Sequence, residues 1–84
     1  MRVDKYLKNA RIIKRRTIAK EACDSGRVEI NGKLAKAGDE VAIGDKLTVR
    51  FGSSTMHLEV LAVPEHVTKD DALTMYRILE DNDV

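Results

Sequence analysis

The sequence predicts an α+β domain, because helical periodicity near both ends of the chain flanks a run of alternating strands. Residues 2–10 and 17–24 have the spacing of amphipathic helices, and residues 27–60 alternate apolar and polar side chains between turn signals. The chain has 84 residues, 43% of them hydrophobic and 35% charged, which is room for one small core. We therefore expect a single domain over residues 1–84.

The first helix should have an apolar side and a basic side. At 100° per residue, one arc holds the apolar residues Val3, Tyr6, Leu7 and Ala10. The opposite arc holds Arg2, Lys5, Lys8 and Asn9. This pattern is typical of a short helix that packs on a core and presents cations to solvent.

A basic connector, residues 11–16, leads to the second expected helix at residues 17–24. Thr17 is the expected N-cap, and Ser25-Gly26 the expected stop, since Gly accepts the left-handed conformation that ends helices. One face of this helix is apolar and should be buried: Ile18, Ala19, Ala22 and Cys23.

Five short strands should follow the second helix. Residues 27–30 and 33–35 form a hairpin around Asn31-Gly32, the strongest two-residue hairpin signal. The other expected strands are residues 41–43, 46–51 and 56–60. In the strand 46–51, alternation points three side chains inward: Leu47, Val49 and Phe51.

A final helix is expected after Pro64. Thr68 would cap it, with Asp71 as its capping-box partner. Its apolar stripe would be Ala72, Met75, Tyr76 and Leu79.

The charge is distributed unevenly along the chain. Residues 1–36 carry eleven Lys and Arg against four acids, whereas residues 37–84 carry four against ten. The net charge of +1 therefore hides a strongly basic first part, which indicates a polyanion as ligand.

The residues predict neither catalysis nor metal binding. His57 and His66 have no third metal ligand beside them, and Cys23 has no adjacent His to activate it. No Gly-rich phosphate loop is present, so we expect no cofactor and no enzymatic activity. A single cysteine, no signal peptide and no apolar span of about 18 residues favour a cytoplasmic protein without a membrane partner.

Folded RNA is the favoured ligand. Tyr6, Phe51 and Tyr76 all fall on apolar stripes, which argues against a platform for base stacking. The second helix presents only Lys20 and Glu21 outward, which is little with which to read the major groove of DNA. Charge alone leaves duplex DNA open, but fixed cations on two helices suit RNA recognised by its shape.

The order of these motifs resembles the S4 RNA-binding domain family. The residues that carry the resemblance are Met1-Arg2-Val3-Asp4-Lys5-Tyr6-Leu7, Arg11, Arg16-Thr17, Ala19, Ala22, Gly26-Arg27-Val28-Glu29-Ile30-Asn31-Gly32-Lys33 and Gly44-Asp45-Lys46-Leu47-Thr48-Val49. The resemblance covers a core motif at residues 1–51 and leaves a strand and helix extension at 52–84. It implies two antiparallel helices packed on a small bent antiparallel sheet, with RNA bound by the basic face of the helices and the adjoining hairpin.

The whole chain is similar to the small stand-alone S4 proteins of bacterial ribosome quality control. The similarity implies a non-catalytic monomer that binds large-subunit rRNA and peptidyl-tRNA on the stalled large ribosomal subunit, beside a factor that adds alanine tails without a template. The alternatives are a factor in ribosome assembly or the heat-shock response, the targeting partner of an RNA-modifying enzyme, and an adaptor that uses the acidic C-terminal half.

Ten residues are expected at the RNA: Arg2, Asp4, Lys8, Arg11, Lys14, Arg15, Arg16, Lys20, Arg27 and Lys33. Arg16 is the first choice, because the amides at a helix entrance add their partial positive charge to that of the side chain. Two roles remain open for Asp4. It orients a cationic neighbour such as Lys8 through an i,i+4 pair, or it accepts a hydrogen bond from a ribose hydroxyl or a base edge.

Overall fold

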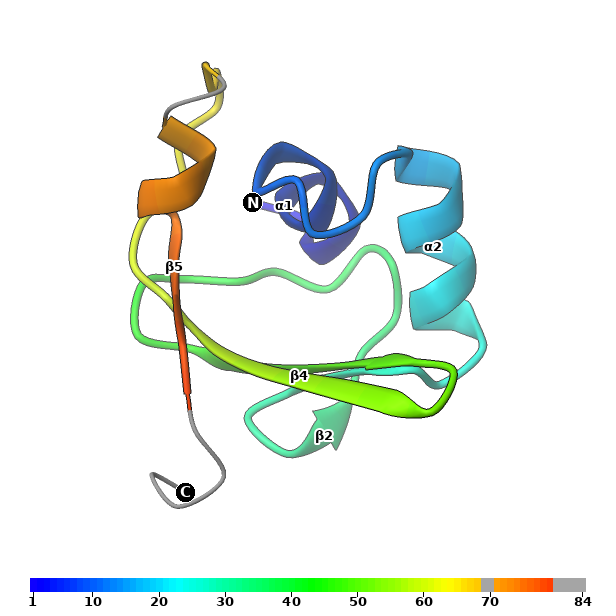
Figure 1. The fold of residues 1–84 in the computed structure, drawn as a ribbon. Coiled ribbons are helices and arrows are strands. Elements are labelled where there is room, and N and C mark those ends of the chain that lie inside the picture. The colour runs from blue at the N-terminus through cyan, green and yellow to red at the C-terminus, as the bar shows by residue number, and fades with distance from the viewer. Residues whose placement is uncertain (69–70, 80–84) are drawn as a thin grey trace.

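Two helices lie on one face of a five-stranded antiparallel sheet in the computed structural model, which describes residues 1–68 and 71–79 (Figure 1). The helices are α1 (Val3–Asn9), α2 (Arg16–Asp24) and the 3-10 helix η1 (Asp71–Thr74). The strands are β1 (Val28–Ile30), β2 (Lys33–Leu34), β3 (Lys46–Phe51), β4 (Ser54–Val60) and β5 (Tyr76–Ile78). The order β2-β1-β3-β4-β5 confirms the α+β class.

The core lies between the helices and the sheet. The apolar arc predicted for the first helix is buried, as are the three small residues of α2: Val3, Tyr6, Leu7, Ala10, Ala19, Ala22 and Cys23. The sheet covers them with residues of β1, β3 and β4: Val28, Leu47, Val49, Leu58 and Val60. Neither helix has the length or the apolar content that crossing a bilayer would need, over the residues that the structure describes.

The second helix departs from its predicted start. It begins at Arg16, with the extended Arg15 as N-cap and no side-chain capping bond, so Thr17 lies inside the first turn and is not the cap. Ile18 is 49% exposed, because it lies at the edge of the arc that Ala19, Ala22 and Cys23 turn toward the core. The expectation of a buried Ile18 was therefore wrong.

The predicted stop of this helix is confirmed. Gly26 has φ +79°, and its N–H donates to the carbonyl of Cys23 at 3.0 Å. The N–H of Arg27 donates to Ala22 at 2.9 Å, which completes a Schellman motif.

The hairpin at Asn31-Gly32 is also confirmed. Both residues have positive φ, 52° and 84°, as a type I′ turn requires. The Asn31 side chain accepts from the N–H of Lys46 at 2.9 Å and donates to Asp45 at 3.1 Å, which ties this turn to the start of β3.

No strand forms at residues 41–43, contrary to the prediction. The segment that precedes β3, drawn in green in Figure 1, crosses between α1 and the sheet. Its backbone forms hydrogen bonds with residues at the N-terminus of the chain. The N–H of Val3 donates to the backbone carbonyl of Asp39 at 2.7 Å, and the N–H of Val41 donates to the backbone carbonyl of Met1 at 2.8 Å. These donors and acceptors are then no longer available to a sheet.

The prediction of a C-terminal helix was also wrong. Its start is as predicted, since the N–H of Asp71 donates to Thr68 Oγ1 at 3.3 Å and the N–H of Thr68 to Asp71 Oδ2 at 3.4 Å. Only one turn of 3-10 helix follows, and then β5 pairs with the edge of β4. Tyr-Arg-Ile is a good strand sequence, and pairing satisfies an edge that would otherwise stay open.

Phe51 does not point inward. It is 42% exposed, being the last residue of β3, where it pairs with Ser54 across the turn to β4. Ala72, Met75 and Leu79 of the expected stripe are buried, although Ala72 lies in η1 and the other two flank β5.

Candidate nucleic-acid interface

A buried carboxylate joins the two helices. The side chain of Asp4 is only 3% exposed, and it accepts from Arg2 through two bonds of 3.2 Å, Nε to Oδ1 and Nη2 to Oδ2. Arg16 Nε lies 3.5 Å from Oδ2, and the N–H of Lys5 donates to Oδ1 at 2.7 Å. A buried charge needs such partners. Asp4 therefore orients cations, as one of the two sequence readings held, but they are Arg2 and Arg16 rather than Lys8.

A first hollow lies around Asp4 and its two arginines. Its volume is about 270 Å³, and its lining comes from the start of both helices: Arg2, Asp4, Arg16, Thr17 and Lys20. The side chains of Arg2 and Arg16 are about half exposed. Each guanidinium has five N–H donors, and Asp4 takes two from Arg2 and one from Arg16. The hollow thus presents oriented donors to an anion.

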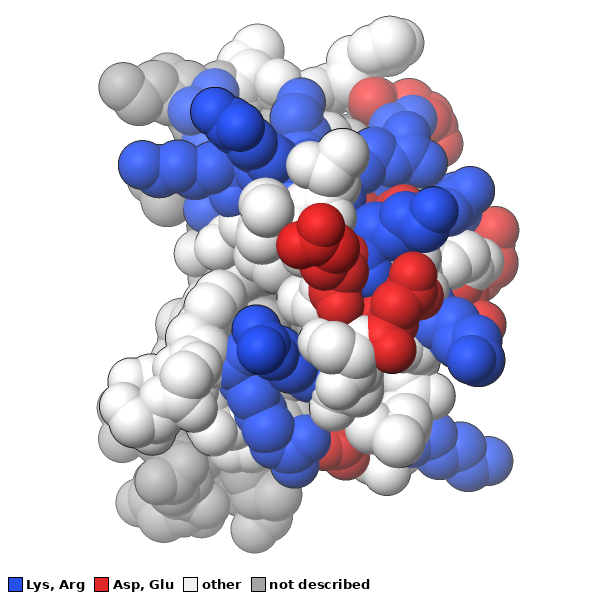
Figure 2. Space-filling model, turned by 90° about the vertical axis from the view of Figure 1, so that its right-hand side faces the viewer, with Lys and Arg blue, Asp and Glu red and all other residues white. Residues whose placement is uncertain are grey.

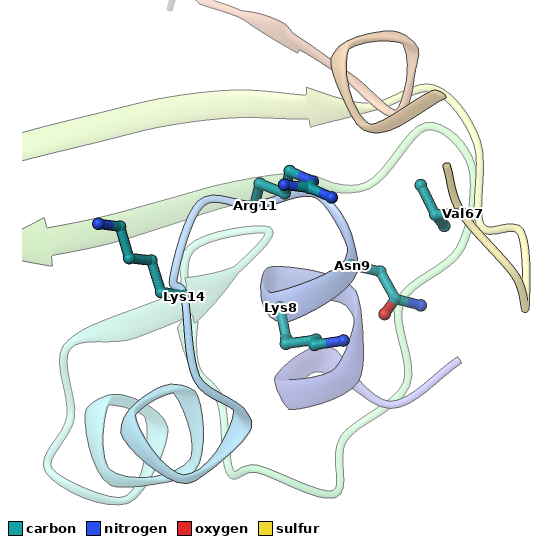
Figure 3. Close-up of a pocket in the computed structure, with 5 residues that line it drawn as sticks. All are labelled: Lys8, Asn9, Arg11, Lys14 and Val67. Atoms are coloured by element: carbon teal, nitrogen blue, oxygen red, sulfur yellow. The ribbon is translucent and has the colours of Figure 1, made fainter. Parts of the chain in front are cut away.

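The second hollow lies at the end of α1 and measures about 420 Å³. Lys8 and Asn9 come from α1, Arg11 and Lys14 from the connector, and Val67 from the segment that precedes η1 (Figure 3). Arg11 stands in the left-handed region at φ +59°. Arg11 occupies the position just after the end of α1 where a Schellman motif commonly has Gly. Its N–H donates to the backbone carbonyl of Lys8 at 3.0 Å, and the N–H of Ile12 donates to that of Leu7 at 3.1 Å.

The linings of the two hollows come close together along the chain. Lys14 lines one and Arg16, two residues further on, lines the other. Arg15 lies between them and is exposed. We use the term helical cationic surface for the seven side chains of Arg2, Lys8, Arg11, Lys14, Arg15, Arg16 and Lys20. In Figure 2, which faces the side of α2, Lys and Arg cover much of the upper half, further Lys and Arg lie in the lower half, and acidic side chains lie near the centre and along the right-hand edge.

Few of these cations are held by carboxylates. Within residues 1–68 and 71–79, the ion pairs of the helical cationic surface are those of Arg2 and Arg16 with Asp4. Lys5, which is not part of this surface, pairs with Glu65 at 2.6 Å. The surface therefore retains most of its positive charge for a ligand.

Arg27 and Lys33 stand apart from this surface. Both are exposed, but Arg27 lies between α2 and β1, Lys33 lies in β2, and neither lines the two hollows. Two exposed acids of α2, Glu21 and Asp24, lie between Lys20 and Arg27 along the chain. The structure brings together eight of the ten predicted residues, counting Asp4 beneath the surface.

Sequence reasoning missed two residues of the second hollow. Asn9 was placed on the basic arc but not chosen, because it carries no charge. Val67 comes from a segment more than 50 residues further along the chain, and no local pattern connects it with α1.

The surroundings of Cys23 do not favour a role as a catalytic nucleophile. Cys23 is 2% exposed, and burial raises the pKa of its thiol to about 11, with Asp4, Asp24 and Asp39 adding to the shift. The thiol is therefore protonated at neutral pH and a poor nucleophile. Among the described residues, no group of three or more His, Cys, Asp or Glu side chains could hold a metal ion.

Comparisons with known proteins agree with this geometry. The profile described as "S4 domain" matches residues 1–47 of the chain. The chain belongs to the S4 domain family. The matched part of this S4 protein contains the whole helical cationic surface. It ends four residues before the end of the core motif expected at residues 1–51.

Two relatives match the S4 protein over nearly its whole length. The protein from Bacillus subtilis is 49% identical over 81 residues, which are 96% of this chain and 94% of that protein. The protein from Halalkalibacterium halodurans is 46% identical over 84 residues, which are 100% of this chain and 96% of that protein. Both are named RQC P-site tRNA stabilizing factor.

A solved structure confirms the S4 fold. Heat Shock Protein 15 from Vibrio cholerae, described as trimeric, superposes with a TM-score of 0.87 at 30% identity. The match covers 94% of this chain and 81% of that one. Because the match covers 94% of this chain, it also includes fold beyond the S4-matched residues 1–47.

Proposed function

We propose that this S4 protein binds the large ribosomal subunit and there contacts rRNA and peptidyl-tRNA during the rescue of stalled ribosomes. It acts as a cytoplasmic monomer without catalysis, and its binding supports template-free alanine tailing by a separate factor. The names of its relatives from B. subtilis and H. halodurans, which describe stabilization of a P-site tRNA, support this proposal.

The observation that carries the proposal is the pairing of Arg2 and Arg16 with one buried Asp4. Two guanidiniums from different parts of the chain are held at a fixed spacing before any ligand arrives, which lowers the cost of ordering them on binding. Fixed spacing suits phosphates whose own positions are fixed by a folded RNA. The release of counterions would supply the affinity, and shape the selectivity.

The test compares Arg16→Ala with Lys46→Ala, a matched loss of one exposed cation outside the helical cationic surface. Binding to purified large subunits that carry peptidyl-tRNA is measured at several salt concentrations. With three to six phosphates neutralised, log affinity should fall with log salt at a slope of roughly −2 to −5. Arg16→Ala should reduce this slope by about one and weaken binding about tenfold.

The controls separate binding from folding. Arg2 still satisfies Asp4 in Arg16→Ala, so the melting temperature should barely move, and Lys46→Ala should bind like the wild type. Equal losses in both variants, or none in Arg16→Ala, would contradict the proposal.

A role in the heat-shock response or in assembly is the second candidate, which the likeness to Heat Shock Protein 15 of V. cholerae favours. One binding measurement distinguishes the two candidate functions. Tighter binding to subunits with peptidyl-tRNA than to empty ones supports rescue, whereas equal binding supports assembly. Light scattering decides between the proposed monomer and a trimer like that described for the V. cholerae protein.

A further inference from the structure

We propose that the second hollow holds a single unpaired nucleotide of the RNA, an inference that rests on the proposed function. Its volume of about 420 Å³ falls within the roughly 300–1,000 Å³ of pockets that enclose small ligands. Its lining combines three cations, one amide and one apolar side chain. In Figure 3, Lys14 lies at one end of the hollow, and Asn9 and Val67 lie at the other.

The cations define the place of the phosphate. Lys8, Arg11 and Lys14 take part in no ion pair within the described residues, so their charge is available to a ligand. Arg11 is held in the left-handed conformation, φ +59°, although it is not a glycine. Strained backbone of this kind persists mainly at functional sites.

Asn9, which lines the hollow, has an amide with a hydrogen bond left to make. Its Nδ2 is buried and has no hydrogen-bond partner, and it is the one side-chain atom of this kind among the described residues. Buried donors without a partner are rare and costly in native proteins. An amide carries a donor and an acceptor side by side, the pattern with which Asn recognises the edge of a base.

Val67 argues that the occupant is more than a phosphate. The segment that contains it is fastened to α1 by the 2.6 Å pair between Lys5 and Glu65, and Val67 itself packs against the core. An apolar wall opposite cations gives no advantage to a bare anion but suits the face of a base or ribose. Bases in a duplex are stacked and present only their edges, so the face is free only in an unpaired nucleotide.

Val67 also lies outside the residues that match the S4 profile. The family part of the chain supplies the cations, and the extension supplies the wall that closes the hollow. The pocket is thus a specific feature built onto a general cationic surface.

The experiment uses short RNA hairpins as probes: one fully paired, and four that differ from it by one bulged A, C, G or U. The full-length chain should bind at least one bulged hairpin about tenfold more tightly than the paired one. Asn9→Ala and Val67→Ala should each reduce this preference to within about twofold. Val63→Ala is the matched control, because Val63 also packs on the core but does not line the hollow.

Stability distinguishes a binding role from a structural one. Asn9→Ala removes an unpaired donor, so its melting temperature should stay the same or rise while the preference for the bulge is lost. Equal binding of all five hairpins by the wild type, or an unchanged preference in Asn9→Ala and Val67→Ala, would overturn the nucleotide pocket. If large subunits still bind in that case, the proposed function stands; failure to bind subunits and hairpins would overturn both.

Discussion

Asp4 owes its importance to where it is buried rather than to its charge alone. A carboxylate with 3% of its side chain exposed gains little stability from its ion pairs, because desolvation offsets most of the attraction. What the pairing does supply is geometry, since one oxygen pair fixes two guanidiniums of the helical cationic surface.

The variant Asp4→Asn tests this role at the level of one residue. It keeps the shape and raises the net charge from +1 to +2, so a purely electrostatic account predicts tighter binding to RNA. If Asp4 positions Arg2 and Arg16, binding to large subunits should instead weaken by about tenfold, or about 1.4 kcal/mol. Filter binding at constant salt measures the difference.

The control for this variant is Asp24→Asn, which makes the same change of charge at an exposed position of α2. It should bind at least as tightly as the wild type. Weaker binding by both variants, or by neither, would show that Asp4 does not act through the two arginines.

At the scale of elements, the junction of α1 and the connector combines strain with charge. Arg11 takes the left-handed position that ends α1, where a residue other than Gly costs about 1 kcal/mol. The side chain at that position lines the second hollow, so the cost coincides with a place where the proposed ligand needs a cation.

We expect Arg11→Gly to separate these two effects. Gly relieves the backbone strain, so the variant should be more stable than Arg11→Ala by about 1 kcal/mol in chemical denaturation. Both variants lack the guanidinium and should bind large subunits equally weakly. Wild-type binding by Arg11→Gly would remove Arg11 from the interface, and equal stability of the two variants would refute the strain.

Elements whose signals are local were predictable from the sequence. The Gly26 stop and the Asn31-Gly32 turn are fixed by the backbone freedom of those residues, and both are confirmed. The strand expected at 41–43 and the C-terminal helix failed, because distant partners decide them. Residues 39–41 bond to the N-terminus, and Tyr76–Ile78 pair with β4.

For the whole molecule, the same distinction applies to the candidate site. Helical periodicity places Arg2 and Lys8 on one arc of α1, and the neighbouring connector and α2 add the other cations of the helical cationic surface. Helical periodicity could not show that Asp4 pairs with Arg16, nor that Val67 lines the second hollow. These contacts depend on how the helices and the extension pack against each other.

The extension also completes the core, so we predict that residues 1–51 do not fold alone. Leu58, Val60 and Met75 are each fully buried, and burial of such a side chain contributes about 1.5–3 kcal/mol. Their combined loss is comparable to the total stability of a domain of this size.

The chain ending at Phe51 should therefore show no cooperative thermal transition by circular dichroism and poor dispersion of its amide NMR signals. Full-length Arg77→Ala, which breaks only the exposed pair with Glu59, should unfold cooperatively within about 1 kcal/mol of the wild type. A cooperative transition of residues 1–51 would instead make the S4-matched part an independent unit, with the extension merely attached to it.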